Sequence, residues 1–207
     1  MTFDYDTWPR RGIYEFFSGV SQPFYSVTFR VDVTRVHEYV RARGLSFYYA
    51  LTWLVTRAVN RVPEFLLTIR GGQVERLSRR EPSFTDIRPG SECFYIVTMA
   101  AGEEIDEFCR EARRHSAEQE VFLNQEGESD ELIYISCAPW LDLTALTNER
   151  NFDRDDAVPR IAWGKYTETN GRLSLGMSVE VNHRLIDGLH LGQFAKALDE
   201  EIARLPD

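Results

Sequence analysis

The segment from residue 160 to residue 183 restricts the fold more than any other part of the sequence. Two β-rich runs, RIAWGKYTET and RLSLGMSVEVNH, flank Asn170-Gly171, a dipeptide typical of a two-residue hairpin turn. Apolar side chains occupy every second position of the second run, at Leu173, Leu175, Met177, Val179 and Val181. Because strand residues alternate between faces, this pattern predicts an antiparallel hairpin with one buried face.

The remaining periodicities predict a mixture of strands and helices. Strands are expected over residues 24–34, 93–100 and 131–140, and a hairpin over residues 66–77 around Gly71-Gly72. Helices are expected from a Thr34 cap to residue 43, from a Ser46 cap to Pro63, over residues 103–123, and over the C-terminal segment. Regular βαβ alternation is missing, so we expect an α+β fold, a two-layer sandwich with a large mixed β-sheet.

The composition excludes several classes of protein. The 207 residues, 43% of them hydrophobic, are expected to form a single domain over residues 1–207. A net charge of −9 opposes nucleic acid as a partner, because phosphate binding requires a basic face. No apolar run spans a membrane and the N-terminus lacks a signal-peptide pattern, so we expect a cytoplasmic protein without membrane contact. Neither the three dispersed cysteines nor the four histidines show ligand spacing, so no metal is expected.

His183 is the next residue on the strand face that carries these apolar residues. It lies at the end of the strand, where burial is expected to end. A partly desolvated imidazole suits general base catalysis, although a core histidine bonded to a carbonyl would show the same pattern. Asp187, before Gly188, also fits two roles. Its carboxylate would cap the final helix, or a guanidinium of Arg10 or Arg11 would hold it bidentately and lock the turn that presents His183.

Four blocks of the sequence resemble the chloramphenicol acetyltransferase family. NHRLIDGLH (182–190) is similar to its His-His-x-x-x-Asp-Gly-x-His signature, and WPRRGIYEFF (8–17) to its N-terminal Trp-x-Arg segment with trailing aromatic residues. YISCAPW (134–140) and PRIAWGKY (159–166) resemble two further family segments. The blocks occur in the family's order at similar spacing, so the resemblance covers nearly the whole chain and implies the fold of coenzyme A-dependent acyltransferases.

The resemblance implies the chemistry and the assembly. The family transfers an acetyl group from acetyl-coenzyme A to a hydroxyl, in homotrimers with active sites at subunit interfaces. His183 would be the general base, without an acyl-enzyme, and Ser136 would stabilise the tetrahedral oxyanion. Asp187 and Arg10 would support the loop of His183.

The resemblance also implies two sets of binding residues. Lys165, Tyr166 and Tyr48 match family residues that contact coenzyme A. Phe17, Phe94 and Ala162 match residues around the acceptor pocket. Each has a structural alternative, because strand-edge lysines are commonly solvated and aromatic residues on strands and helices commonly pack in the core.

Several positions depart from the family pattern. Asn182 replaces the first histidine of the pair, Tyr134 an asparagine, Ala162 a threonine, and Ser46 a lysine that contacts coenzyme A, which predicts a less basic cofactor site. These changes leave the identity of the acceptor undetermined, since pocket polarity strongly affects substrate choice. The alternatives are an acyltransferase with another acceptor, a non-catalytic trimeric binding protein, and the catalytic core of a dihydrolipoyl acyltransferase.

Overall fold

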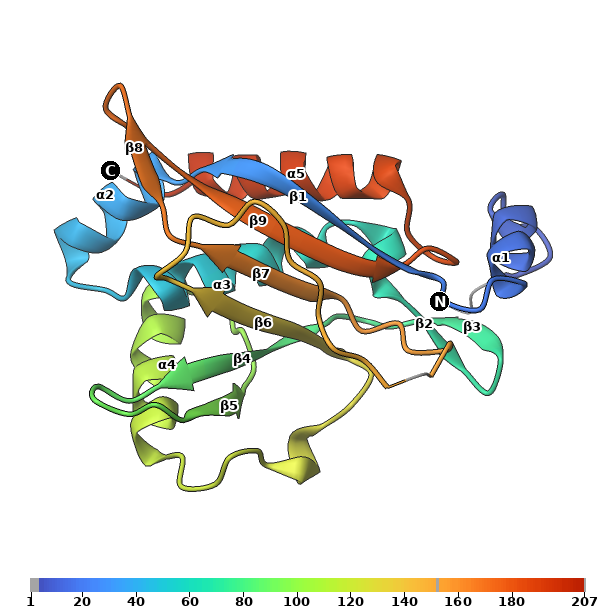
Figure 1. Cartoon of the computed structure of the whole chain (residues 1–207), viewed down its shortest axis with the longest axis horizontal. Coiled ribbons are helices and arrows are strands. Elements are labelled where there is room, and N and C mark those ends of the chain that lie inside the picture. Colours follow the sequence, from blue (N-terminus) through green and yellow to red (C-terminus); the bar gives the residue numbers. More distant parts are fainter. Residues whose placement is uncertain (1–3, 152, 207) are drawn as a thin grey trace.

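A seven-stranded mixed sheet organises the computed structural model, which describes residues 4–151 and 153–206 (Figure 1). Its strands are β1 (Phe24–Asp32), β4 (Glu81–Ile87), β5 (Phe94–Thr98), β6 (Leu132–Ala138), β7 (Arg160–Gly164), β8 (Thr167–Thr169) and β9 (Arg172–Asn182). They lie in the order β1-β9-β7-β6-β4-β5, and β8 pairs with β9. β6 runs parallel to both β4 and β7, and the other pairs are antiparallel.

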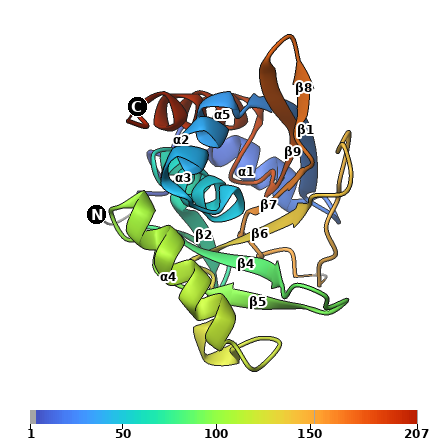
Figure 2. The same cartoon turned by 90° about the vertical axis from the view of Figure 1, so that its left-hand side faces the viewer.

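Helices cover one face of this sheet, which confirms the two-layer α+β prediction (Figure 2). They are α2 (Thr34–Arg43), α3 (Phe47–Asn60), α4 (Ile105–Glu118) and α5 (Gly188–Ala203), and α1 (Arg11–Ser18) lies apart, beside the end of β9 (Figure 1). The alternating residues of β9 face the helices, and Leu175, Met177 and Val179 are completely buried. None of the helices in the described ranges is long and apolar enough to cross a membrane.

The opposite face of the sheet is crossed by residues 139–151 and 153–158, here called the strap (Figure 1). Its backbone lies directly on the strands, since a methyl group at Gly176 would overlap the carbonyl oxygen of Leu143. The Ser26 and Ser178 hydroxyls donate to the Leu146 carbonyl, each at 2.8 Å. The strap therefore buries polar side chains of β9 that would otherwise face water.

Several local predictions are confirmed. Ser46 caps α3 by accepting a hydrogen bond from the Tyr49 backbone, and Gly44 ends α2 in the left-handed conformation with φ of 66°. Both hairpin turns form, with φ of 57° and 78° at Gly71-Gly72, between β2 (Leu67–Arg70) and β3 (Gln73–Arg76). At Asn170-Gly171 the φ values are 52° and 77°, as a type I′ turn requires.

Other predictions of element boundaries are wrong. The expected strand over residues 160–169 is split into β7 and β8. The long helix ends at residue 118, because Leu123 pairs with Ile96 of β5 as an isolated bridge. Val33 rather than Thr34 is the N-cap of α2, where the Asp32 carboxylate accepts from the Thr34 backbone. Two short 3-10 helices also occur, at Pro63–Leu66 and Gln125–Gly127.

The sequence pattern did not predict α1 or β4. β4 lacks clear alternation and is held by its neighbours β5 and β6 and by Arg80 just before it. The Arg80 side chain is completely buried and donates to five backbone carbonyls, those of Phe65, Leu67, Asp130, Leu132 and Ala157. These contacts come from distant segments, so no local sequence pattern predicts them.

Candidate active site

His183 lies immediately after β9, where the sheet ends. Its backbone N–H donates to the Pro23 carbonyl at 2.7 Å, which ties the turn to the start of β1. The half-buried ring stacks on Phe17, with centroids 4.0 Å apart, and lies 4.3 Å from the Tyr25 ring. Within the described ranges the ring makes no hydrogen bond to a carbonyl. Burial lowers the pKa of His183 below its ordinary value, so the imidazole is neutral near pH 7 and able to accept a proton.

Arg184 fastens the turn that carries His183, a role that sequence reasoning missed. Its buried guanidinium donates to the Tyr14 hydroxyl at 2.6 Å and to the Ser18 hydroxyl at 2.9 Å, both on α1. It also pairs with Asp155 of the strap at 2.6 Å. The turn is thereby held between α1, which bears Phe17, and the strap.

Asp187 performs both of the roles considered for it. One carboxylate oxygen accepts from the Leu189 backbone at 3.0 Å and caps α5, and the other pairs with Arg10. The pairing uses a single nitrogen of Arg10, so the expected bidentate contact is wrong. Nε and Nη2 of Arg10 are buried and have no hydrogen-bond partner among the described residues. Burial alone would raise the pKa of Asp187, but the hydrogen bond and charge of Arg10 outweigh it and lower that pKa.

His190 completes the cap of α5. Its Nδ1 accepts from the Asp187 backbone N–H at 3.0 Å, a position usually held by Glu or Gln in a capping box. Burial lowers its pKa, which favours the neutral ring that this acceptor role requires. Among the described residues, no three His, Cys, Asp or Glu side chains gather closely enough to hold a metal ion.

Ser136 lies on the sheet face away from the helices, together with Tyr134 two residues earlier, as the alternation of β6 predicted. A pocket of about 300 Å³ opens here and brings Ser136 together with Phe94, as expected. Its lining also includes Phe122, Glu128, Tyr134 and Arg160. Ala162 pairs with Ser136 in the sheet register, but it is buried and does not line this pocket in the single chain.

His183 and Ser136 do not meet within one chain. Ser136 is in register with Ala162, and Ala162 with Ser178, so Ser136 and Ser178 lie two strand spacings apart. His183 comes five residues after Ser178. With about 4.8 Å between strands and about 3.3 Å per residue, the two Cα atoms are separated by roughly 19 Å. In one chain, Phe17 therefore lies beside the histidine and Phe94 beside the serine, at two separate places.

The residues expected to contact coenzyme A gather near the N-terminus of α3. The Tyr48 hydroxyl donates to the Thr85 carbonyl at 2.7 Å, and the Tyr166 ring lies 5.3 Å from that of Phe47. Lys165 is exposed beside Tyr166. A further pocket is lined by Ser46 together with Arg43, Arg110 and Arg113. Arginines from α2 and α4 thus surround Ser46, while the expectation of a less basic cofactor site stays a prediction.

The sheet order and the covering helices define the class as the coenzyme A-dependent acyltransferase fold. A solved chloramphenicol acetyltransferase superposes with a TM-score of 0.86 at 24% identity, covering 98% of this chain and 100% of its own. The dihydrolipoamide acetyltransferase of Azotobacter vinelandii superposes with a TM-score of 0.70 at 17% identity, covering 93% and 86%. These likenesses concern the fold.

The family follows from sequence comparison. The family model of chloramphenicol acetyltransferase matches residues 1–199, so the chain belongs to the chloramphenicol acetyltransferase family. Chloramphenicol acetyltransferase 3 of Escherichia coli is 27% identical over 203 residues, covering 96% of this chain and 94% of its own. Chloramphenicol acetyltransferase of Streptomyces acrimycini is 28% identical over 204 residues, covering 97% and 93%. The protein is an acetyltransferase of this type.

Proposed function

We propose that this protein transfers an acetyl group from acetyl-coenzyme A to a hydroxyl of chloramphenicol or a similar small molecule, with His183 as general base. The observation that carries the proposal is the environment of His183. Its ring is half-buried against Phe17 and Tyr25, it is neutral because of burial, and no hydrogen bond within the described ranges occupies its nitrogens.

The chemistry needs no covalent enzyme intermediate. His183 takes the proton of the acceptor hydroxyl while its oxygen forms a bond to the thioester carbonyl carbon. The Ser136 hydroxyl donates to the oxyanion that results. Collapse of this species breaks the carbon–sulfur bond, and the imidazolium returns its proton to the departing thiolate, leaving an acetyl ester and free coenzyme A. A positioned base contributes about 10²–10⁴-fold, and one oxyanion donor about 10²–10³-fold.

We propose a homotrimer in which His183 of one subunit completes the Ser136 pocket of the next. The separation of roughly 19 Å within one chain supports this assembly, because a base and an oxyanion donor must both lie within hydrogen-bond reach of the reacting atoms. β1, which begins beside His183, is an edge strand of the sheet and is free to contact another subunit.

Mixing two inactive variants tests both the reaction and the shared site. His183→Ala and Ser136→Ala, unfolded together and refolded at equal amounts, are expected to regain about a quarter of wild-type activity, since every mixed trimer holds one intact site. The measurement is free coenzyme A released from acetyl-coenzyme A with chloramphenicol. Each variant refolded alone is the control. Activity no higher than the sum of the controls would contradict the shared site. No release by the wild type with chloramphenicol but release with another alcohol would favour a different acceptor, and no release with any acceptor would favour the binding-protein alternative.

The acetyl donor is proposed to lie along Tyr48, Tyr166 and Lys165. Its phosphate groups would reach the cluster of Arg43, Arg110 and Arg113, whose charge suits them. We also propose that residues 1–207 form one domain, a proposal supported by a core that runs from Tyr14 to Leu205. A cytoplasmic location is proposed as well, because acetyl-coenzyme A is available there.

The pH dependence of the reaction is expected to report on His183. Burial lowers its pKa below 6.5, and only the neutral ring accepts a proton. We therefore expect kcat/KM to fall as the pH drops through an apparent pKa below 6.5 and to be flat above it. Loss of thioester absorbance is a suitable readout, because it does not depend on a pH-sensitive thiol reagent. An acid limb centred above pH 7 would be inconsistent with this base.

A further inference from the structure

The pocket beside Ser136 contains a carboxylate whose charge is not compensated by the described residues of the single chain. One oxygen of Glu128 accepts from the Tyr134 hydroxyl at 2.7 Å. The other, Oε1, is buried and has no hydrogen-bond partner among the described residues. Glu128 also makes no ion pair within those residues. A buried carboxylate oxygen without a donor is costly, so its neighbourhood favours a ligand that supplies one.

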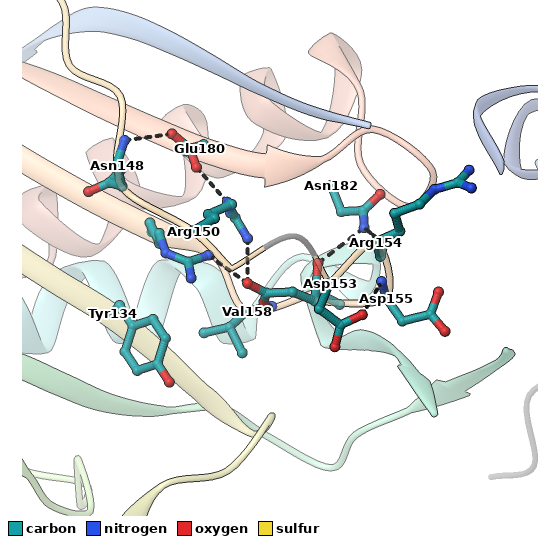
Figure 3. Close-up of polar contacts among 12 residues, drawn as sticks. Tyr134, Asn148, Arg150, Asp153, Arg154, Asp155, Val158, Glu180 and Asn182 are labelled. Carbon is teal, nitrogen blue, oxygen red and sulfur yellow. Dashed lines mark hydrogen bonds and ion pairs between the residues drawn. The ribbon is translucent and has the colours of Figure 1, made fainter. Parts of the chain in front are cut away.

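The arginine in the lining of this pocket is already neutralised. Arg160, in the same pocket, pairs with Asp156 at 2.9 Å, and Asp156 also binds Arg150 at 2.7 Å. Arg150 pairs in turn with Glu180 at 2.5 Å, and Figure 3 shows these contacts between the strap and β9. Two arginines and two carboxylates therefore balance one another. They leave no positive charge for Glu128.

The rim of the pocket is also suited to a cation. Phe94 and Phe122 are 50% and 56% exposed, and their rings meet edge to face with centroids 5.4 Å apart. Exposed aromatic faces attract ammonium groups. Glu149, exposed at the same pocket, adds a second negative charge.

We infer that this pocket binds acceptors that carry a protonated amine, with Glu128 as the specificity-determining residue. The amine pairs with the Glu128 carboxylate beneath the Phe94–Phe122 rim. The reacting hydroxyl of the same molecule lies toward Ser136, which neighbours Tyr134 on the same face of β6. The position of that hydroxyl rests on the proposed function. The inference adds that an amino alcohol is a better acceptor for this protein than a neutral molecule.

Two probes that share the same aryl diol and differ in the charge at nitrogen test this inference. The first is the amine that remains when the dichloroacetyl group is removed from chloramphenicol, an amino diol protonated near pH 7. The second is its N-acetyl derivative, which keeps both hydroxyls and is neutral. Affinity is measured by calorimetry without acetyl-coenzyme A, and turnover is measured separately as coenzyme A release, with the product analysed for O-acetylation.

Glu128→Gln keeps a partner for the Tyr134 hydroxyl and removes the charge. We expect it to weaken binding of the amine by roughly 10- to 100-fold and to change binding of the amide by less than about threefold. Glu118→Gln, 61% exposed on α4 and outside this pocket, is the matched control and is expected to change both by less than about threefold. Thermal unfolding of both variants checks that they are folded.

The outcomes separate the two proposals. Equal losses for amine and amide in Glu128→Gln, or no binding of the amine by the wild type, would overturn the inference even if chloramphenicol is acetylated. Selective loss of amine binding without coenzyme A release from any acceptor would support the inference and contradict the proposed function.

Discussion

Replacing His183 with alanine is expected to lower kcat/KM for acetyl transfer by roughly 10²–10⁴-fold, the usual contribution of a positioned base. The loss should appear mainly in kcat, because the ring acts on the proton that moves in the transition state. Because the ring acts on the proton in the transition state and not in ground-state binding, the KM for the acceptor should change little. Steady-state rates of coenzyme A release measure both constants.

His115→Ala is the matched control for this prediction. His115 is also half-buried but lies on α4, outside both halves of the site, so the rate should stay within about twofold of wild type. A His183→Ala enzyme that retains more than about a tenth of wild-type kcat would show that another group removes the proton. Near-ultraviolet circular dichroism establishes that the loss of contacts to Phe17 and Tyr25 has not disordered the turn.

Arg150→Met is expected to destabilise the protein by about 3–5 kcal/mol, the largest effect on stability that we predict. The Arg150 side chain is only 8% exposed and Glu180 is 6% exposed, so removal of the guanidinium leaves a buried carboxylate without a cation. Only the Asn148 backbone N–H, at 2.8 Å, then still donates to Glu180 within the described residues. Urea unfolding at a single protein concentration measures the change in the free energy of unfolding.

Two further variants test the cause of this loss of stability. Arg114→Met removes an arginine that is 50% exposed and paired with Glu111 and Glu118 on α4, so the expected change is below about 1 kcal/mol. Arg150→Met combined with Glu180→Gln removes both charges and should be more stable than Arg150→Met alone. A double variant as unstable as the sum of the single variants would show that packing, not the charge pair, causes the loss.

The predictable parts of the fold are those decided by neighbouring residues. The faces of β9 follow from a period of two, and Asn170-Gly171 and Ser46 act within a few residues of their own positions. α1 and β4 were missed because distant segments hold them. For α1 these contacts include the donation from Arg184 to Tyr14, which joins residues 170 positions apart.

The candidate site also contains some residues that the sequence predicted and others that it did not. Sequence reasoning singled out His183, Ser136, Asp187 and Arg10, and the ion pair between the last two is present. It did not find Arg184, His190 or Glu128. Arg184 acts through Tyr14 and Ser18, which lie 170 and 166 positions away, so local spacing could not reveal its role. The partners of His190 and Glu128 lie only three and six positions away, and the pattern analysis overlooked them. For Arg184, a basic residue directly after the candidate base was the one available signal.

The sequence by itself determined which face of the last strand is buried, where its turn begins and which family the four blocks resemble, because these depend on short-range periodicity and residue identity. Only the tertiary structure decided that the histidine and serine lie roughly 19 Å apart in one chain, since that separation depends on the sheet order β9-β7-β6. It also decided that the strap neutralises the arginines near the Ser136 pocket and leaves Glu128 uncompensated. This charge balance depends on tertiary packing, because the ion pair that joins the strap to β9 links Arg150 and Glu180, 30 positions apart.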